Sequence, residues 1–324
     1  MTLRLSRIFK MKHVLLLGDI NIDVQMRVPA LPALGGEVLT SGIQLSLGGS
    51  ASNAAVVLAK LGRLGGLQHL TAHIIGRVGQ DEWASIALQA LQRCGVATST
   101  VQRDPIVSTS VLFNAITPDG ERSMFTHRGA NVHTDPGQMP PALFEQADWL
   151  HISGYALLNL PQRAAVWQAV EWARQRQIPI SLDPALYPAQ NAPEQIRALL
   201  PHLALCVMGR DEAEAIMPTP LAQGQPTVPE LLASFFDTGV CMVALKLGAN
   251  GCVIATRDQA HSLPAVPAKV IDTTGAGDAF SAGAIYGCLH GWALPQTGQL
   301  ANRLGSLATE VMGSGEALRV ERMK

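Results

Sequence analysis

The chain has 324 residues, of which 48% are hydrophobic and 15% are charged, with a formal net charge of −1 at pH 7. This is enough for one large core, or for a core with a smaller satellite. The even charge balance and the 5% aromatic content argue against a nucleic-acid partner. No apolar run reaches the roughly 18 residues of a transmembrane helix, so no membrane partner is expected. The five scattered cysteines contain no Cys-x-x-Cys pair, which argues against zinc and disulfides and favours a cytoplasmic location.

The first hundred residues predict a strand, a helix, a second strand and a second helix. Residues 1–10 precede the first clear pattern and are predicted to form a disordered extension. Residues 13–17 are a short apolar run, typical of a buried strand, and 52–61 are rich in small residues, typical of a closely packed helix. Residues 73–75 predict a short strand, and 82–94 an amphipathic helix that ends at a glycine.

From residue 149 onward, apolar strands alternate with helical patterns. The predicted strands are 149–153, 178–183, 203–208 and 240–245, and the predicted helices are 161–175, 193–200, 211–217 and 229–236. Such alternation is typical of a parallel sheet that is covered by helices on both faces.

Two segments interrupt this alternation with period-two patterns and no helix. Residues 24–47 and 106–126 predict β ribbons, with turns near Gly35 and near Pro118. They would form one small sheet acting as a lid over the core, or two ordinary surface hairpins. On the first interpretation, the lid comprises 24–47 and 106–126, and the core comprises 12–23, 48–105 and 127–324.

A glycine pair and a carboxylate lie where a loop near the C-terminus passes into a helix. Gly275 and Gly277 allow close approach of an anion, and N–H groups at a helix start favour negative charge. Asp278 would oppose phosphate binding, so we interpret it as a base that takes a proton from an attacking hydroxyl. The alternative is a plain loop with a helix cap. A Walker A loop is disfavoured because the chain has no Gly-Lys pair, and a dinucleotide fingerprint because Phe280 replaces the third glycine.

Polar residues follow the first predicted strand and open the next helix. Asn21 and Asp23 share one face by period two, and an amide with a carboxylate can bind vicinal hydroxyls. The alternative is an Asx-rich turn. Gly49 permits close approach and Asn53 can reach a ligand hydroxyl, unless Ser50 or Ser52 simply caps the helix.

Two later strand ends carry candidate metal and nucleotide ligands. Glu212, in a first helical turn, could hold water on a magnesium ion or merely complement the helix dipole. Lys246 and the backbone from Gly248 to Gly251 could contact nucleotide phosphates or form an ordinary hairpin turn.

Together these segments resemble the ribokinase-like (PfkB) carbohydrate kinase family. The resemblance rests on the run from Asp272 to Gly283 and on Gly48, Gly49 and Asn53, in the same order across 13–318. It implies an α/β fold, with a three-layer α/β/α core around a mainly parallel sheet and a small β-sheet lid. It also implies ATP-dependent phosphorylation of a hydroxyl on a sugar or a sugar-like small molecule.

The resemblance also implies roles for individual residues. Asp278 would be the general base, and the amides of Gly275, Ala276 and Gly277 would form the anion hole. The remaining implied contacts are Asn21, Asp23, Gly49 and Asn53 for substrate; Lys246, Gly248, Gly251 and Asn302 for nucleotide; Glu212 for Mg²⁺ through water; and Asp272 and Thr274 for K⁺ or another monovalent cation.

The chain departs from the family pattern at two places. Gly209 replaces the asparagine of Asn-x-x-Glu, and the region from Ser153 to Tyr155 replaces an acidic residue of ribokinases. Ribose, fructose, a keto-deoxy sugar acid and a nucleoside therefore remain candidate acceptors. The alternatives are a nucleoside kinase of the same family and a catalytically impaired protein that binds sugar or nucleotide. Exposed lid edges favour a homodimer that pairs through the lid.

Overall fold

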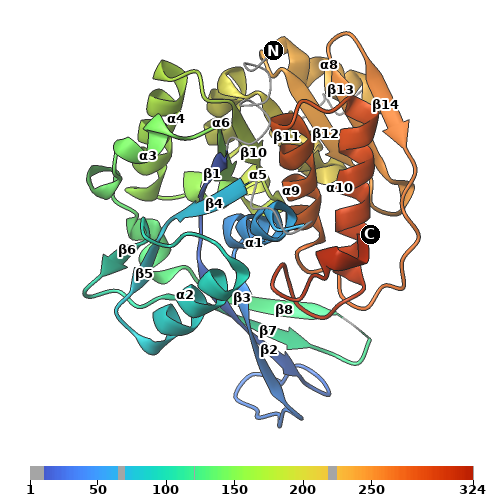
Figure 1. Ribbon diagram of the computed structural model, residues 1–324. Helices are drawn as coiled ribbons and strands as arrows, with labels where there is room; N and C mark the ends of the chain where they lie inside the picture. The colour runs from blue at the N-terminus through green and yellow to red at the C-terminus, as the bar shows by residue number, and fades with distance from the viewer. Residues whose placement is uncertain (1–10, 65–69, 120, 218–224, 324) are drawn as a thin grey trace.

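The computed structural model describes residues 11–64, 70–119, 121–217 and 225–323 (Figure 1). The expected extension at 1–10 lies outside these residues. Within the described ranges, eight strands form the main sheet, in the order β14-β13-β12-β11-β10-β9-β1-β4. Their bounds are β1 Lys12–Leu17, β4 Leu70–Ile75, β9 Trp149–Ser153, β10 Ile180–Asp183, β11 Leu205–Gly209, β12 Met242–Lys246, β13 Cys252–Thr256 and β14 Ala260–Leu263.

The sheet is parallel from β4 to β12, as the alternating pattern predicts, and antiparallel at the edge formed by β13 and β14. The antiparallel edge arises because the turn after β12 returns the chain directly as a hairpin. The carboxyl ends of β1, β9, β10, β11 and β12 therefore meet at one edge of the sheet, where ligands gather in open α/β folds.

Two hydrophobic clusters cover the two faces of the sheet, which confirms the three layers. In β1, Val14 and Leu16 belong to one cluster while Leu15 and Leu17 belong to the other, because side chains alternate along a strand. The first cluster includes α1 (Ser50–Gly62), α2 (Glu82–Cys94), α9 (Ala276–Leu289) and α10 (Leu294–Thr309). The second includes α4 (Gln162–Gln175), α6 (Pro193–Leu199), α7 (Arg210–Ile216) and α8 (Val228–Asp237).

The two predicted ribbons join into one small sheet that projects from the core, at the bottom of the view in Figure 1. In the described residues its strand order is β3-β2-β7-β8: Ile43–Gly48, Asn21–Arg27, Ser110–Ile116 and Arg122–His127. The central pair β2 and β7 is parallel, and the outer pairs are antiparallel. We call this sheet the lid sheet. Only three residues separate the end of β1 from Asn21, where β2 begins, so the connection from the core to the lid sheet is short.

The two faces of the lid sheet differ in polarity. Asp23, Gln25 and Asn114 share one face and are buried. The opposite face carries Phe113 and Phe125, which are directly paired and 43% and 64% exposed. On the Phe113 face, Ile22, Val24 and Val111 are buried in the first core cluster, so only the outer part of that face is exposed. We call the face with the buried polar residues the inner face of the lid sheet and the other its outer face.

Candidate active site

The residues predicted to form an anion hole lie at the start of α9. Gly275 has φ of +75°, a left-handed conformation that suits glycine, and α9 begins at the next residue. First-turn N–H groups lack helical acceptors and are free to bind an anion. Of the three predicted amides, that of Ala276 donates to Thr273 O at 3.3 Å. A Cβ built on Gly277 would lie 3.3 Å from Lys246 Nζ, so a cationic side chain stands at the mouth of this helix.

Asp278 joins the first turns of two helices. Its Oδ1 accepts a hydrogen bond from Ser50 Oγ at 2.6 Å and its Oδ2 one from Asn53 Nδ2 at 2.7 Å. Burial and the nearby Asp183 carboxylate raise the pKa of Asp278 to about 6, although Ser50 and Asn53 act to lower it. A base with this pKa is ionised at neutral pH and can still accept a proton from a hydroxyl.

The close approach of α1 to Asp278 depends on Gly49. This residue has φ of +94°, and a Cβ there would lie 2.2 Å from Asp19 O. Gly49 is the N-cap of α1 and supplies no side chain, so the alternative that Ser50 caps this helix is wrong. Ser50 instead points its hydroxyl at Asp278.

Behind Asp278 lies an ionic cluster of Asp183, Glu212 and Lys246. Lys246 Nζ is 3.2 Å from Asp183 Oδ2 and 3.7 Å from Glu212 Oε2. Burial alone would lower the pKa of Lys246, but the two carboxylates outweigh it and raise the pKa, so the ammonium stays charged. Ser281 Oγ also donates to Asp183 Oδ2 at 2.7 Å.

The cluster fits a magnesium ion that is held mainly by water and phosphate. Two carboxylates face one ammonium, and burial raises the pKa of Glu212, so a cation would favour its ionised form. In the described part of the chain, no group of three or more His, Cys, Asp or Glu side chains could hold a metal. Mg²⁺ is commonly bound through one or two carboxylates, waters and substrate phosphates, and Glu212 suits that role.

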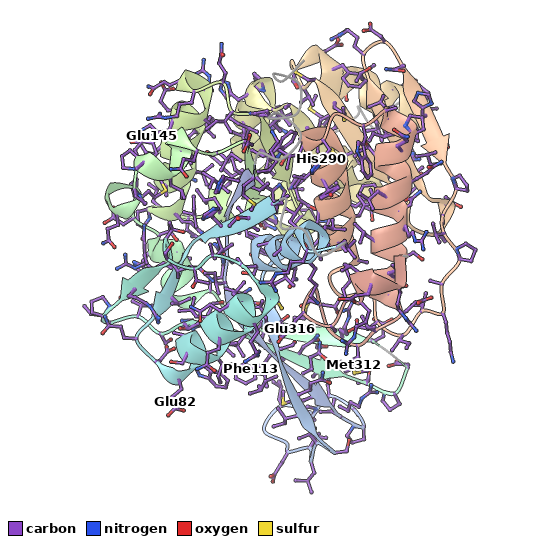
Figure 2. All side chains as sticks on the ribbon, viewed as in Figure 1. Glu82, Phe113, Glu145, His290, Met312 and Glu316 are labelled. Carbon is purple, nitrogen blue, oxygen red and sulfur yellow. The ribbon has the colours of Figure 1, made fainter. Side chains whose placement is uncertain are left out.

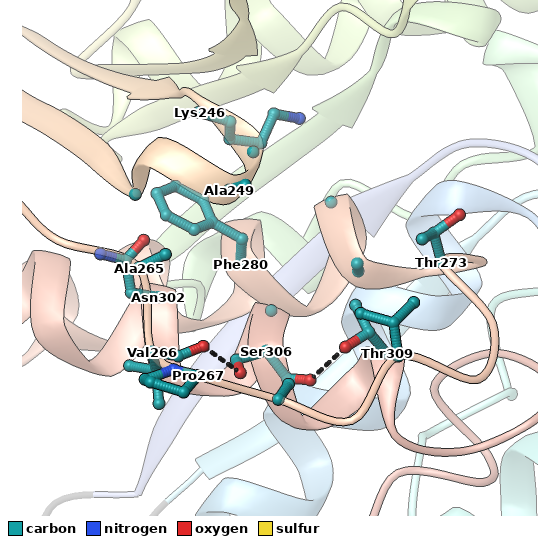
Figure 3. Close-up of a pocket in the computed structure, with 17 residues that line it drawn as sticks. Lys246, Ala249, Ala265, Val266, Pro267, Thr273, Phe280, Asn302, Ser306 and Thr309 are labelled. Carbon is teal, nitrogen blue, oxygen red and sulfur yellow. Dashed lines mark hydrogen bonds between the residues drawn. The ribbon is translucent and has the colours of Figure 1, made fainter.

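The four predicted nucleotide residues line one cavity of about 510 Å³, together with Ala276 and Gly277 of the anion hole (Figure 3). Phe280 and apolar residues of the segment 265–270 form much of its lining. Its lining includes Lys246, Gly248, Gly251, Asn302, Ala265, Val266 and Ser306. Asn302 donates its amide to Pro264 O at 3.0 Å, which fixes the wall of the cavity.

Two of the predicted substrate residues lie near Asp278: Asn53 donates to its carboxylate, and its charge acts on Asp23. Asp23 Oδ1 and Asn53 Oδ1 are buried and have no hydrogen-bond partner among the described residues. Leaving a buried acceptor unpaired costs about 1–3 kcal/mol, so a ligand hydroxyl would be favoured here. Burial and the Asp278 charge raise the pKa of Asp23 to about 7. Asn21 differs, because its Oδ1 accepts from Asn131 Nδ2 at 2.8 Å and helps to hold the start of β2.

The expected cation ligands Asp272 and Thr274 are bonded to each other. Asp272 Oδ1 accepts from Thr274 N at 2.9 Å and from Thr274 Oγ1 at 2.7 Å, and its Oδ2 accepts from Gly313 N at 3.0 Å. The guanidinium of Arg122 also approaches both side chains.

Gly209 lies directly opposite Lys246 in the register of β11 and β12. Its φ is −80°, and a Cβ there would lie 3.5 Å from Glu212 Oε2, an ordinary contact. The backbone therefore accommodates a side chain at this position, and the missing asparagine is not imposed by the fold.

Sequence reasoning missed Ser50 as a partner of Asp278, and it missed Asp183, Asn114 and Arg122 altogether. Asp183 ends a parallel strand at the ligand-binding edge, a position that could have revealed it. Asn114 shares the inner face of the lid sheet with Gln25, and its buried Oδ1 is unpaired within the described residues. Only the folded chain brings Arg122 to the loop before α9.

The chain is similar to proteins of one family in sequence and in fold. The model of the pfkB family carbohydrate kinases matches residues 11–320. The 5-dehydro-2-deoxygluconokinase of Geobacillus thermodenitrificans is 29% identical over 279 residues, covering 84% of this chain and 79% of that protein. The aminoimidazole riboside kinase of Salmonella typhimurium is 28% identical, covering 84% of each chain. A putative ribokinase II from E. coli, solved with ATP and Mg²⁺, superposes with a TM-score of 0.81 at 21% identity, covering 96% of each chain.

The chain therefore belongs to the pfkB family of carbohydrate kinases, and its fold is ribokinase-like. Among the described helices, none combines the length and the apolar character that crossing a bilayer requires.

Proposed function

We propose that the protein transfers the γ-phosphate of ATP, in the presence of Mg²⁺, to a hydroxyl of a sugar or sugar-like molecule. The observation that carries this proposal is the position of Asp278. Its carboxylate lies at the anion-hole helix, beside the nucleotide-sized cavity, and is bonded to Asn53, whose Oδ1 is unpaired. The E. coli structure with ATP and Mg²⁺ supports the choice of donor.

In this proposal the nucleotide fills the cavity of Figure 3, with its phosphates directed to Lys246 and the amides of 275–277. Mg²⁺, held by water on Glu212, would neutralise phosphate charge. Asp278 accepts the proton of the acceptor hydroxyl. The oxygen then forms a bond to the γ-phosphorus while the bond between that phosphorus and the bridging oxygen breaks, releasing ADP. The amides and Lys246 stabilise the charge on the transferring group.

Asp23 and Asn53 would orient the acceptor through its neighbouring hydroxyls. Their unpaired oxygens can accept hydrogen bonds that water would otherwise make. Holding the hydroxyl against Asp278 turns a bimolecular encounter into a local one, which can lower the barrier by several kcal/mol.

The test is ADP release measured with a panel of acceptors: 5-dehydro-2-deoxygluconate, ribose, ribose 1-phosphate, fructose, aminoimidazole riboside and inosine. We expect one acceptor to stimulate ADP formation at least about 100-fold over water. ATP binding with no stimulation by any acceptor would instead support a catalytically impaired binding protein.

A riboside is the second candidate acceptor. Gln25 and Asn114 place two buried amides on the inner face of the lid sheet, and amides can pair with the donors and acceptors of a base. The Salmonella relative is named for a riboside. Preference for aminoimidazole riboside or inosine over every free sugar would favour this candidate.

We also propose a homodimer formed through the lid sheet. Its apolar outer face exposes Ile43, Leu45, Phe113 and Phe125, a set that favours burial against a second copy. Gel filtration with light scattering should give a dimer, and substitution of Phe125 by Lys should give a monomer. The use of ATP suits a cytoplasmic location.

A further inference from the structure

An arginine of the lid sheet reaches the loop that leads into the anion hole. Arg122 is the first residue of β8, and its guanidinium lies 2.5 Å from Thr274 Oγ1, 3.2 Å from Thr273 Oγ1 and 3.6 Å from Asp272 Oδ1. These three residues immediately precede Gly275, where the anion hole starts. The contact joins positions about 150 residues apart in the chain.

The opposite side of the same loop is held by the segment after α10. Asp272 Oδ2 accepts from Gly313 N, and the Gly275 backbone lies against Ser314, whose Cβ would be 3.1 Å from a Cβ on Gly275. Ser314 Oγ in turn donates to Leu47 O at 2.7 Å, at the end of a lid strand. The loop is therefore enclosed between Arg122 and a segment that also contacts the lid sheet.

The carboxylate of Asp272 faces the guanidinium of Arg122. Its Oδ1 lies 3.6 Å from the Arg122 guanidinium and accepts two hydrogen bonds from Thr274, while its Oδ2 accepts one from Gly313. Asp272 is mostly covered, at 13% side-chain exposure, and Arg122 is 34% exposed. Since its oxygens already accept from Thr274 and Gly313 and face a guanidinium, Asp272 and Thr274 do not fit an additional monovalent cation.

We propose that Arg122 is a positioning residue. Its guanidinium, which is carried by the lid sheet, holds the loop 272–274 in place and thereby fixes the amides of the anion hole in the conformation that binds phosphate. Two consequences follow. The anion hole takes its phosphate-binding form when the lid sheet lies against the core, and turnover does not require K⁺. The kinetic part of this inference rests on the proposed kinase function.

The contacts of Arg122 differ from those of an ordinary surface ion pair. An exposed pair contributes about 0–1 kcal/mol to stability and would leave catalysis unchanged. Here the guanidinium also bonds two hydroxyls in the residues directly before the amides that would hold the phosphate. Small displacements of such groups can reduce turnover about 100-fold.

The kinetic test compares Arg122→Ala and Arg122→Lys with Arg27→Ala. Arg27 is a matched control, because it is also a lid arginine that reaches the C-terminal segment, 3.5 Å from Met312 Sδ, and it forms no ion pair with any of the described residues; Figure 2 shows Met312 beside the lid sheet. With the best acceptor of the panel, we expect kcat to fall about 10- to 100-fold in Arg122→Ala. We expect a smaller fall in Arg122→Lys, partial rescue of Arg122→Ala by millimolar guanidinium, and no change in Arg27→Ala.

Cation dependence gives a second readout. Wild-type kcat should change less than about threefold when tetramethylammonium replaces K⁺, while Arg122→Ala should be stimulated by K⁺. A wild type that loses more than about tenfold without K⁺ would overturn the proposal. So would an Arg122→Ala variant with the kcat of Arg27→Ala.

Hydrogen exchange tests the positioning independently of any acceptor. In the full-length protein, peptides covering 271–281 should exchange at least about tenfold faster in Arg122→Ala than in wild type or Arg27→Ala, with a similar melting temperature. Equal exchange in all three proteins would refute the role of Arg122. Faster exchange in a protein that phosphorylates nothing would refute the kinase function alone.

Discussion

Ser50 and Asp278 lie in the first turns of α1 and α9, 228 residues apart in sequence, and their side chains are hydrogen-bonded at 2.6 Å. One helix start thus supplies a donor to the carboxylate on the other. Asn53, one turn further along α1, bonds the second oxygen of the same carboxylate. The proposed base is therefore held in a single orientation by one helix while its own helix presents amides to phosphate.

Replacing Asp278 with Asn should remove most turnover while preserving nucleotide binding. General base catalysis contributes about 10²- to 10⁴-fold, so we expect kcat to fall by at least 100-fold. Asn53 and Ser50 can still bond the amide, so the local fold should persist. Calorimetry with ATP and Mg²⁺ checks binding, and near-normal kcat would contradict the assigned role.

The pH dependence of kcat/KM should show an acid limb near pH 6. Burial and the Asp183 charge raise the pKa of Asp278 to about 6, and the base acts only when ionised. Activity should therefore fall as the pH drops through 6 and level off above 7. A flat profile from pH 5 to 8 would show that another group takes the proton.

Substitution of Ser50 by Ala should shift the acid limb of the kcat/KM profile to higher pH. The Ser50 hydroxyl stabilises the ionised carboxylate, so its loss raises the pKa of Asp278 further. Activity should drop more at pH 6 than at pH 8. Ser85→Ala, at an exposed position of α2, is the control and should leave the profile unchanged. An equal loss at both pH values would indicate a different role for Ser50.

Asp23→Asn should stabilise the unliganded protein while weakening acceptor binding. The folded-state pKa of about 7 lies above the ordinary value of 3.8, so folding favours the protonated acid. That stabilisation is complete below about pH 4 and is lost as the pH rises through 7. The variant should thus melt at least about 2 °C higher than wild type at pH 8, with a smaller difference at pH 5. Asp258→Asn, which changes an exposed residue, is the control.

Gly49→Ala should be strongly destabilising. A Cβ there would lie 2.2 Å from Asp19 O, and the φ of +94° disfavours any L side chain. Strain of this kind costs about 1–3 kcal/mol, and the clash adds to it. Gly42→Ala, where a Cβ meets nothing within 4 Å, should be neutral in urea unfolding. Comparable stability of the two variants would show that the α1 start can shift.

Local patterns were enough to predict most of the core. Apolar-run and helical patterns identified β9 and α2 with their observed bounds, and the glycine pair at 275 and 277 marked the start of α9. What the sequence could not provide was the pairing of distant segments. The parallel pairing of β2 with β7 joins two ribbons nearly 90 residues apart, and the contact of Arg122 with Thr274 depends on that sheet.

Asp23 and Asp278, which are both proposed to contact the acceptor, belong to different parts of the molecule. Asp23 lies on a lid strand, Asp278 on a core helix, and Gly18–Ile20 is the whole connection on that side. Asn131 clamps this connection by accepting from Ile20 N at 2.9 Å and donating to Asn21 Oδ1 at 2.8 Å. In the proposed reaction, an acceptor that contacts both the lid sheet and the core would be aligned for attack, whereas a water molecule is too small to contact both. Discrimination against hydrolysis would then arise from the alignment of two rigid parts, with no special chemistry demanded of the base.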